Sequence, residues 1–129
     1  MRYIMLIYSK EKEGGPTPED AQEIRTAHRA VMQETSQKGV LRGAEPLAPT
    51  STATTVRMQS GAMLITDGPF AETKEQLAGY YILDCDNLDQ AIEWAAKIPT
   101  ACKGGEGCIE IRPILEMAGD ALRFRSLNG

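Results

Sequence analysis

The only histidine of the chain, His28, is the residue best suited to proton transfer near neutral pH. An imidazole titrates closer to neutrality than any other side chain, which makes it a natural general acid or base. His28 stands four residues after Ile24 and four before Met32, so on a helix it falls within an apolar stripe that faces the core. Two interpretations stay open. It is either a core histidine bonded to a backbone carbonyl or an acid–base residue at a buried cavity. A polar ring in an apolar stripe needs either a buried hydrogen-bond partner or a cavity.

A second group of candidates lies in the segment AMLITDGPFAETKEQLAG, residues 62–79. Asp67 is a candidate catalytic carboxylate, although Asp-Gly-Pro is also ordinary turn chemistry. The connection from Asp67 to Ala78 is longer than the roughly two to five residues of a tight hairpin, and long connections are often functional. We therefore expect a loop that either contacts a ligand or locks a dimer, with ETKEQ as a short helical turn. Its candidate ligand-binding residues are Phe70, Glu72 and Lys74.

Two residues outside this loop are further ligand-binding candidates. Tyr80 and Tyr81 place one phenol on each face of a strand, and Tyr81 is the one that we assign to a pocket. Arg112 alternates with isoleucines in a mostly apolar strand, where it could pair with a buried carboxylate or bind an anionic ligand.

The sequence does not predict a metal or an organic cofactor. Cys102 and Cys108 flank KGGEG, but a zinc site normally needs about four ligands and His28 is far away in sequence. The glycine-rich KGGEG also lacks the spacing of a phosphate-binding loop.

The composition is that of one ordinary globular domain, with 129 residues, 42% hydrophobic and 25% charged residues, and a net charge of −4. A mildly acidic chain without a basic cluster is a poor candidate for binding nucleic acid or an anionic membrane. Its longest apolar run, Tyr3–Tyr8, is too short to span a bilayer and does not resemble a signal peptide. Three cysteines, an odd number, favour a reducing cytoplasm over a disulfide framework.

The elements that must position the candidates follow from periodicity and end signals. One helix is predicted from Pro18 to about Lys38, with Thr17 as its N-cap. A second helix is predicted to begin after its N-cap, Asn87, and to end before Pro99. Strands are predicted at residues 3–8, 40–49 (ended by Pro46) and 79–85, with a final strand at 108–115. Residues 52–58 and 62–66 should form a hairpin around QSG.

The element order β-α-β-(β-β)-β-α-β predicts an α+β fold of ferredoxin-like type, an antiparallel sheet with two helices on one face. In the first strand Tyr3, Met5 and Ile7 point one way and Ile4, Leu6 and Tyr8 the other, so the face without helices would carry a sizeable apolar patch with either set. Because a large exposed apolar patch usually marks an interface, we expect a homodimer whose sheets pack face to face. Residues 1–117 form the expected domain, and residues 118–129 a weakly patterned C-terminal tail.

From MRYIMLIY to IRPI the chain resembles the YCII-related family, and DGPFAETKEQLAGYY resembles its branch with a DGPF motif. This resemblance implies a dimeric α+β barrel and a small bacterial protein without known activity. It also implies two function classes. One is an enzyme without a cofactor, acting on a small organic molecule; the other is a non-catalytic accessory or regulatory module linked to sigma-factor signalling.

The resemblance also bears on the residues of the site. Smaller members of the family carry a histidine on the first helix and an aspartate just after the second, proposed as a catalytic dyad. His28 matches the histidine, whereas Ile98 occupies the position of the aspartate. Asp67 is therefore the substitute carboxylate that we expect beside His28, provided that its strand lies in the sheet covered by the first helix.

Overall fold

The structure is a computed structural model that describes residues 1–100, 106–118 and 121–123. Its elements are, in order, β1 (Arg2–Ser9), α1 (Pro18–Gln37), β2 (Leu41–Pro46), a 3₁₀ turn (Thr50–Thr52), β3 (Thr54–Gln59), β4 (Ala62–Asp67), β5 (Gln76–Asp84), α2 (Leu88–Ala95), β6 (Gly107–Pro113), β7 (Glu116–Ala118) and β8 (Ala121–Arg123).

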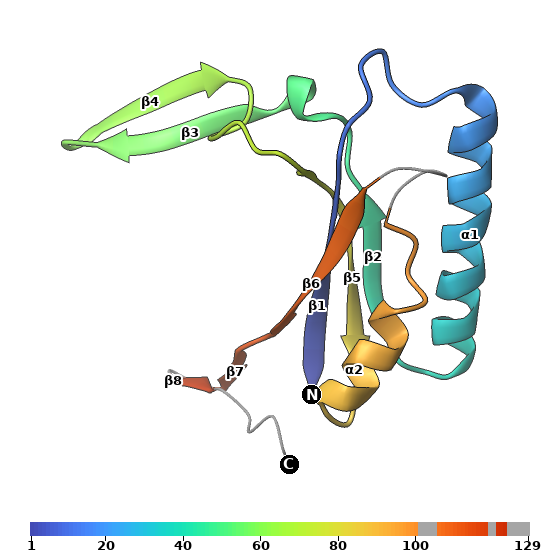
Figure 1. The fold of residues 1–129 in the computed structure, drawn as a ribbon. Helices are drawn as coiled ribbons and strands as arrows, with labels where there is room; N and C mark the ends of the chain where they lie inside the picture. Colours follow the sequence, from blue (N-terminus) through green and yellow to red (C-terminus); the bar gives the residue numbers. More distant parts are fainter. Residues whose placement is uncertain (101–105, 119–120, 124–129) are drawn as a thin grey trace.

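The main sheet is antiparallel with the strand order β2-β5-β1-β6. Both helices lie on one of its faces, with α1 beside β2 and α2 beside β6 (Figure 1). This arrangement confirms the predicted α+β architecture with two helices on one face and is consistent with a ferredoxin-like fold. The crossover from β1 through α1 to β2 leaves room between them for β5, which contributes Tyr81 to the helix-covered face.

The core lies between the sheet and the helices because successive side chains of β1 alternate between the two faces. Tyr3, Met5 and Ile7 are buried on the helix side, where Met5 faces Tyr81 across the β1–β5 pairing. The alternate residues of β1 are only partly buried, as expected for a sheet face without helices. Leu83, Cys85, Ala91, Trp94 and Ile98 from the rest of the chain also belong to the buried core.

Helix α1 begins and ends where the sequence predicts. The hydroxyl oxygen of Thr17 accepts a hydrogen bond from the Asp20 backbone N–H at 3.1 Å, and Pro18 occupies the first helical position. After the helix, Gly39 adopts φ +74°, the left-handed conformation that lets the chain turn into β2. The buried hydroxyl of Thr35 donates to the Val31 carbonyl at 2.8 Å, which satisfies the polar group inside the stripe.

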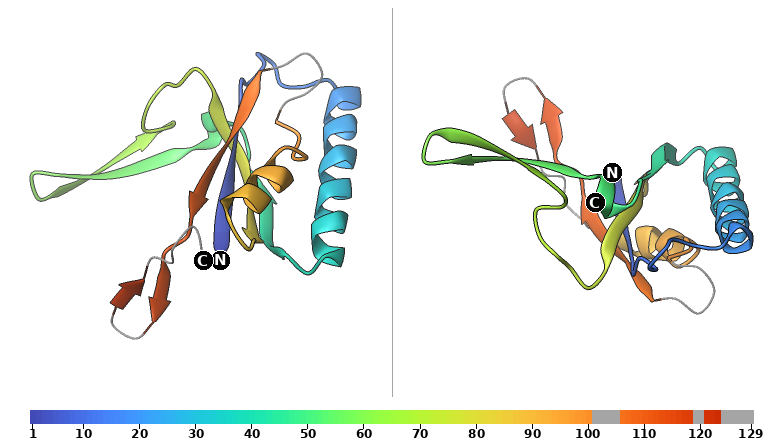
Figure 2. Two further views of the ribbon diagram at one scale, coloured as in Figure 1. Left: turned by 60° about the horizontal axis from the view of Figure 1, so that its bottom comes forward. Right: turned by 90° about the horizontal axis from the view of Figure 1, so that it is seen from above.

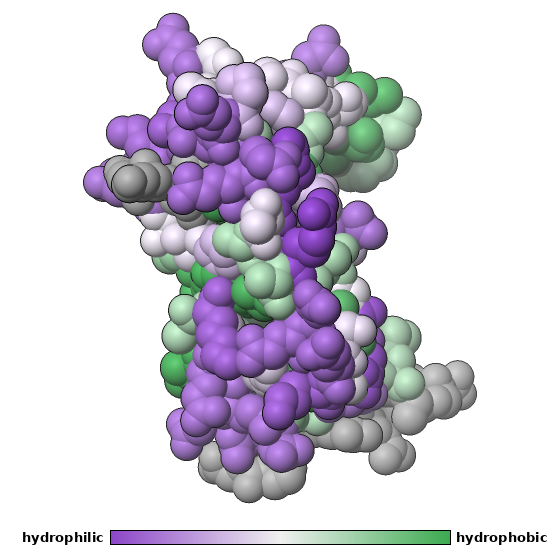
Figure 3. All heavy atoms as spheres, turned by 90° about the vertical axis from the view of Figure 1, so that its right-hand side faces the viewer, coloured by the Kyte–Doolittle hydropathy of each residue, from purple (hydrophilic) through white to green (hydrophobic). Residues whose placement is uncertain are grey.

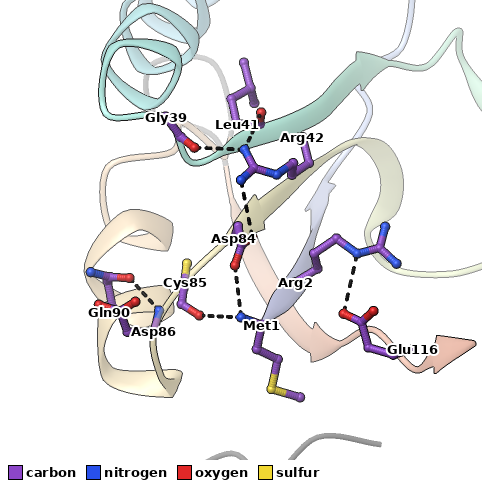
Figure 4. Close-up of polar contacts among 10 residues, drawn as sticks. All are labelled: Met1, Arg2, Gly39, Leu41, Arg42, Asp84, Cys85, Asp86, Gln90 and Glu116. Carbon is purple, nitrogen blue, oxygen red and sulfur yellow. Dashed lines mark hydrogen bonds and ion pairs between the residues drawn. The ribbon is translucent and has the colours of Figure 1, made fainter. Parts of the chain in front are cut away.

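The lower end of the sheet is joined by a cluster of polar contacts around Asp84 (Figure 4). Its carboxylate accepts from the Met1 α-amino group at 2.9 Å and from the Arg42 guanidinium at 3.3 Å, which ties β1 and β2 to β5. The hydrogen bond from the α-amino group, assisted by the charge of Arg42, lowers the pKa of Asp84 below its ordinary value.

The predicted hairpin forms, but not as part of the main sheet. Strands β3 and β4 pair only with each other, joined by Ser60 and Gly61 at φ +51° and +79°, and they project from the side opposite the helices (Figures 1 and 2). The expectation that Asp67 ends a strand of the helix-covered sheet was therefore wrong.

The loop between β4 and β5 is shorter than predicted. Gln76, Leu77 and Ala78 already belong to β5, so the irregular segment covers residues 68–75. The predicted helical turn at ETKEQ is absent from this described segment, which instead bends, with the Gln76 amide donating to the Thr73 carbonyl at 2.6 Å. In the described part of the chain, neither helix is long and apolar enough to cross a membrane.

Candidate functional site

A cavity of about 770 Å³ lies between α1 and the adjoining ends of β1, β2 and β5. This volume is within the range of small-molecule sites. Part of its wall is apolar, from Ile24 and Met32 on the helix and from Leu47 and Leu77 on the sheet side. Seen from the side of α1, the surface is mostly hydrophilic, with hydrophobic side chains in smaller areas between the hydrophilic ones (Figure 3).

The wall of this cavity contains a pair formed by His28 and Tyr81. His28 Nδ1 lies 2.8 Å from the Tyr81 hydroxyl oxygen, and the two rings stack with their centroids 5.8 Å apart and their planes inclined by 25°. The same hydroxyl lies 3.4 Å from the backbone carbonyl oxygen of His28. The expectation that His28 faces the sheet is confirmed, and its partner there is a phenol.

Local structure explains why these two residues meet although 53 positions separate them. His28 lies on the same side of α1 as the buried Val31, one turn further along, and Thr35, two turns further along, so its ring is directed toward the sheet. Tyr81 points to the helix-covered face because it is in register with Met5, whose side chain is fully buried. The histidine is partly buried, and the tyrosine is 2% exposed.

Burial sets the protonation state of both groups. Desolvation lowers the pKa of His28 below its ordinary value, because a partly buried imidazolium loses hydration. Desolvation also raises the pKa of Tyr81 to about 12. At pH 7 the site therefore holds a neutral imidazole next to a neutral phenol.

Tyr81 occupies one of the two ring nitrogens of His28 and leaves Nε2 as the nitrogen for another partner. If the Tyr81 hydroxyl donates to Nδ1, the imidazole proton sits on Nε2, which can then donate a hydrogen bond to a ligand. If Nδ1–H donates to the Tyr81 oxygen and that hydroxyl donates to the His28 carbonyl, Nε2 has a free lone pair and accepts a proton. In the second tautomer His28 can thus act as a base at Nε2, and the imidazolium that forms on accepting a proton can return it as an acid.

The residues of the β4–β5 connection are placed elsewhere. Asp67 is exposed at the end of β4, opposite Thr54, and Phe70 is 76% exposed. Glu72 and Lys74 are exposed in the bent segment, and none of these four side chains lines the cavity. Within the described chain, the structure brings neither Asp67 nor its loop neighbours to His28.

Arg112 and Tyr80 belong to the sheet face opposite the helices. Arg112 is exposed on β6, opposite Ile4 of β1, and forms no ion pair with a described residue. Tyr80 alternates with Tyr81 and pairs with Leu6, so its ring points away from His28. Of the sequence-derived site residues, only His28 and Tyr81 are therefore brought together.

Ile98, which stands where smaller relatives carry an aspartate, is 4% exposed and packs in the core with Trp94 and Ala91. A carboxylate at this apolar position would need a buried partner to stay ionised. The hydroxyl of Tyr81, rather than a carboxylate, is the group that hydrogen-bonds the imidazole here.

Sequence reasoning did not identify the basic residues of the cavity. Arg25 and Arg29 are exposed on α1, one turn apart and on either side of His28 in sequence, and Lys10 follows β1. Their spacing around His28 was the available signal, since residues three or four apart on a helix lie on one side.

Metal-binding chemistry has little support within the described residues, where no three histidine, cysteine or acidic side chains cluster. Cys85 is buried, and burial raises the pKa of its thiol to about 11, so it is a packing residue. Cys108 is exposed on β6, and Cys102, the other half of the pair considered from sequence, lies outside the described residues.

Comparison with known proteins assigns this architecture to a described family. Residues 1–118 match the model of the YCII-related domain. The chain is also similar to the uncharacterized protein R00369 of Rhizobium meliloti (strain 1021), with 36% identity over 115 residues, which cover 88% of this chain and 92% of that protein.

Proposed function

We propose that this chain, which belongs to the YCII-related family, binds a small organic molecule in the cavity beside α1 and uses His28 as an acid or base toward it. The observation that carries the proposal is the contact of 2.8 Å between His28 and Tyr81 in the wall of a 770 Å³ cavity. A partly buried histidine with a lowered pKa and a fixed partner is typical of acid–base sites.

In this proposal, His28 Nε2 accepts a proton from the bound molecule or returns one to it. Tyr81 is a positioning residue, because it holds the ring through Nδ1 and stacks against it. No metal or organic cofactor is required for such a transfer, which matches the cofactor-independent type of enzyme that the family resemblance implies.

The test is an NMR titration of the imidazole. His28 is the only histidine, so its ring resonances need no assignment by mutation. We expect a pKa below that of a solvent-exposed histidine, unchanged in Asp67→Asn, and altered tautomer-sensitive ¹⁵N shifts in Tyr81→Phe. An ordinary pKa, or ¹⁵N shifts that Tyr81→Phe leaves unchanged, would contradict the acid–base role.

A second candidate is a binding module without catalysis, such as the regulatory role linked to sigma factors. The burial of Ile98 favours it, because the carboxylate of the family's proposed dyad has no counterpart beside His28. Binding of a small molecule that persists unchanged in His28→Gln, with no turnover of any bound compound, would support this second function.

We also propose that the protein is a homodimer. The β3–β4 hairpin has one apolar face, with Val56, Met58, Met63 and Ile65 each between 60% and 68% exposed. A hairpin of two strands is marginally stable alone and needs a surface to pack on. The helix-free face of the main sheet, with Ile4, Leu6 and Ile82 partly exposed, gives a second copy such a surface.

Sedimentation at micromolar concentration tests the dimer. We expect a dimer for the native chain and a shift to monomer in Val56→Asp/Ile65→Asp, whereas Arg57→Gln, on the other face of the same hairpin, should remain dimeric. A native monomer would exclude the proposal.

Two further properties belong to the same proposal. The DGPF sequence at residues 67–70 supports membership of the family branch that carries this motif. The free thiols of Cys85 and Cys108 support a reducing, cytoplasmic location.

A further inference from the structure

We infer that the molecule bound in this cavity is an organic anion, with a carboxylate or phosphate group held by Arg25 and Arg29 and an apolar body against the inner wall. The inference rests on the proposed small-molecule site and adds the chemical class of its ligand. It differs from the sequence-derived idea that Arg112 binds an anion, because Arg112 lies on the opposite face of the sheet.

Basic side chains outnumber acidic ones around the cavity, although the chain as a whole carries a net charge of −4. Lys10, Lys12, Arg25 and Arg29 line it. Lys12 is already paired with Asp20 at 3.7 Å. Arg25 contacts the neutral side chain of Gln22 at 3.2 Å, and Arg29 and Lys10 form no ion pair with any described residue. Three cations are therefore available to a ligand.

The two acidic residues of the lining, Glu11 and Glu45, offset these cations only in part. The carboxylate of Glu11 is engaged by Thr50, accepting from its backbone N–H at 3.1 Å and from its hydroxyl. Glu45 is in register with Tyr80, whose side chain lies on the helix-free face of the sheet, so the Glu45 carboxylate points away from His28. With Lys12 paired to Asp20, the three remaining cations outnumber these two carboxylates, so the lining carries an excess of positive charge.

The two arginines are suited to a planar or tetrahedral anion. They lie four residues apart, one turn along α1, so both guanidinium groups can approach one ligand group and donate to its oxygens. Ile24 and Met32 lie on the same helix and offer apolar contact, and His28 lies between these two residues, four positions from each. An anionic group at the arginines would place the apolar part of the ligand beside His28 Nε2.

The experiment uses two probes of the same shape, 2-naphthoate and its neutral amide, 2-naphthamide. Binding is followed through the His28 ring resonance, which reports on the cavity alone because the chain has one histidine. We expect both probes to shift this resonance and naphthoate to bind about tenfold more tightly, since two charge-assisted contacts are added. Added salt should reduce this preference.

The variants separate the anion contact from the cavity itself. Arg25→Gln/Arg29→Gln should abolish the preference for naphthoate and leave the naphthamide affinity unchanged. Arg57→Gln, on the hairpin outside the cavity, removes the same type of charge and should preserve the preference. Circular dichroism of each variant confirms that α1 is still folded.

Equal affinities for the two probes, or a preference that survives the double variant, would overturn the anion proposal while leaving the small-molecule site intact. If neither probe shifts the His28 resonance, or if Ala48→Trp at the cavity edge has no effect on binding, the proposed site itself fails.

Discussion

Replacing Tyr81 by phenylalanine removes the hydroxyl that contacts His28 and little else. The ring is 2% exposed and keeps its packing against β1, so the change in stability reports on the hydrogen bond. A typical internal hydrogen bond contributes about 1 kcal/mol net, and the cavity lets water reach the freed Nδ1. We therefore expect a loss of about 1 kcal/mol in the free energy of unfolding, or roughly 4 °C in Tm.

The assay is urea denaturation at fixed protein concentration, followed through the fluorescence of Trp94. It is the only tryptophan and is 9% exposed in the native core. Tyr80→Phe is the matched control, since its hydroxyl lies on the helix-free face and forms no hydrogen bond with the described residues. Equal losses in the two variants, or no loss in Tyr81→Phe, would refute the reasoning.

Three other predictions concern stability. The pKa of His28 is lower in the folded chain than in the unfolded chain, so the unfolded chain binds the proton first as pH falls. The free energy of unfolding should therefore fall as pH drops below about 6.5. His28→Gln should flatten this pH dependence, and an unchanged pH dependence in the variant would contradict the role of His28. Gly79→Ala places a Cβ 2.8 Å from the Glu45 carbonyl oxygen and should lose about 1–3 kcal/mol, whereas Gly43→Ala meets only a side chain at 3.8 Å; similar melting temperatures would exclude this clash. The Asp84 carboxylate has a lowered pKa, so its contribution is present above about pH 4 and lost in more acid solution. Because this side chain is 39% exposed, Asp84→Asn should lose less than about 1 kcal/mol at pH 7 in urea denaturation, and a larger loss would show a tighter network.

The parts of the fold that local chemistry decides were predictable. Thr17 and Asn87 cap their helices through side-chain oxygens, and the Ser60–Gly61 turn closes the hairpin as the pattern indicates. The alternation of β1 also separated Tyr3, Met5 and Ile7 from Ile4, Leu6 and Tyr8, and the structure shows that the first set faces the helices. These features depend on a few neighbouring residues, so a single sequence contains the information.

The position of the hairpin depended on contacts that no local pattern encodes. Its alternating strands suit either the main sheet or a separate one, and the structure places them in a sheet of two strands. That placement removes Asp67 from the neighbourhood of α1. It also explains why the loop candidates did not become site residues.

The sequence predicted part of the site. His28 was identifiable because it interrupts an apolar helical stripe, whereas its partner was one of two adjacent tyrosines. Choosing Tyr81 over Tyr80 as the partner requires the register of β5 against β1, a relation between residues about 75 positions apart. Arg25 and Arg29 were missed because exposed arginines on a helix usually face solvent, and only the cavity gives them a ligand-facing role.

The most direct test of the central claim is the His28 ring resonance during titration with the neutral probe 2-naphthamide, in the native chain and in Ala48→Trp. The account predicts a saturable shift in the native protein and a much weaker one in the variant, whose indole occupies the edge of the cavity. No shift in the native protein, or the same shift in both, would contradict a small-molecule site at His28 and Tyr81.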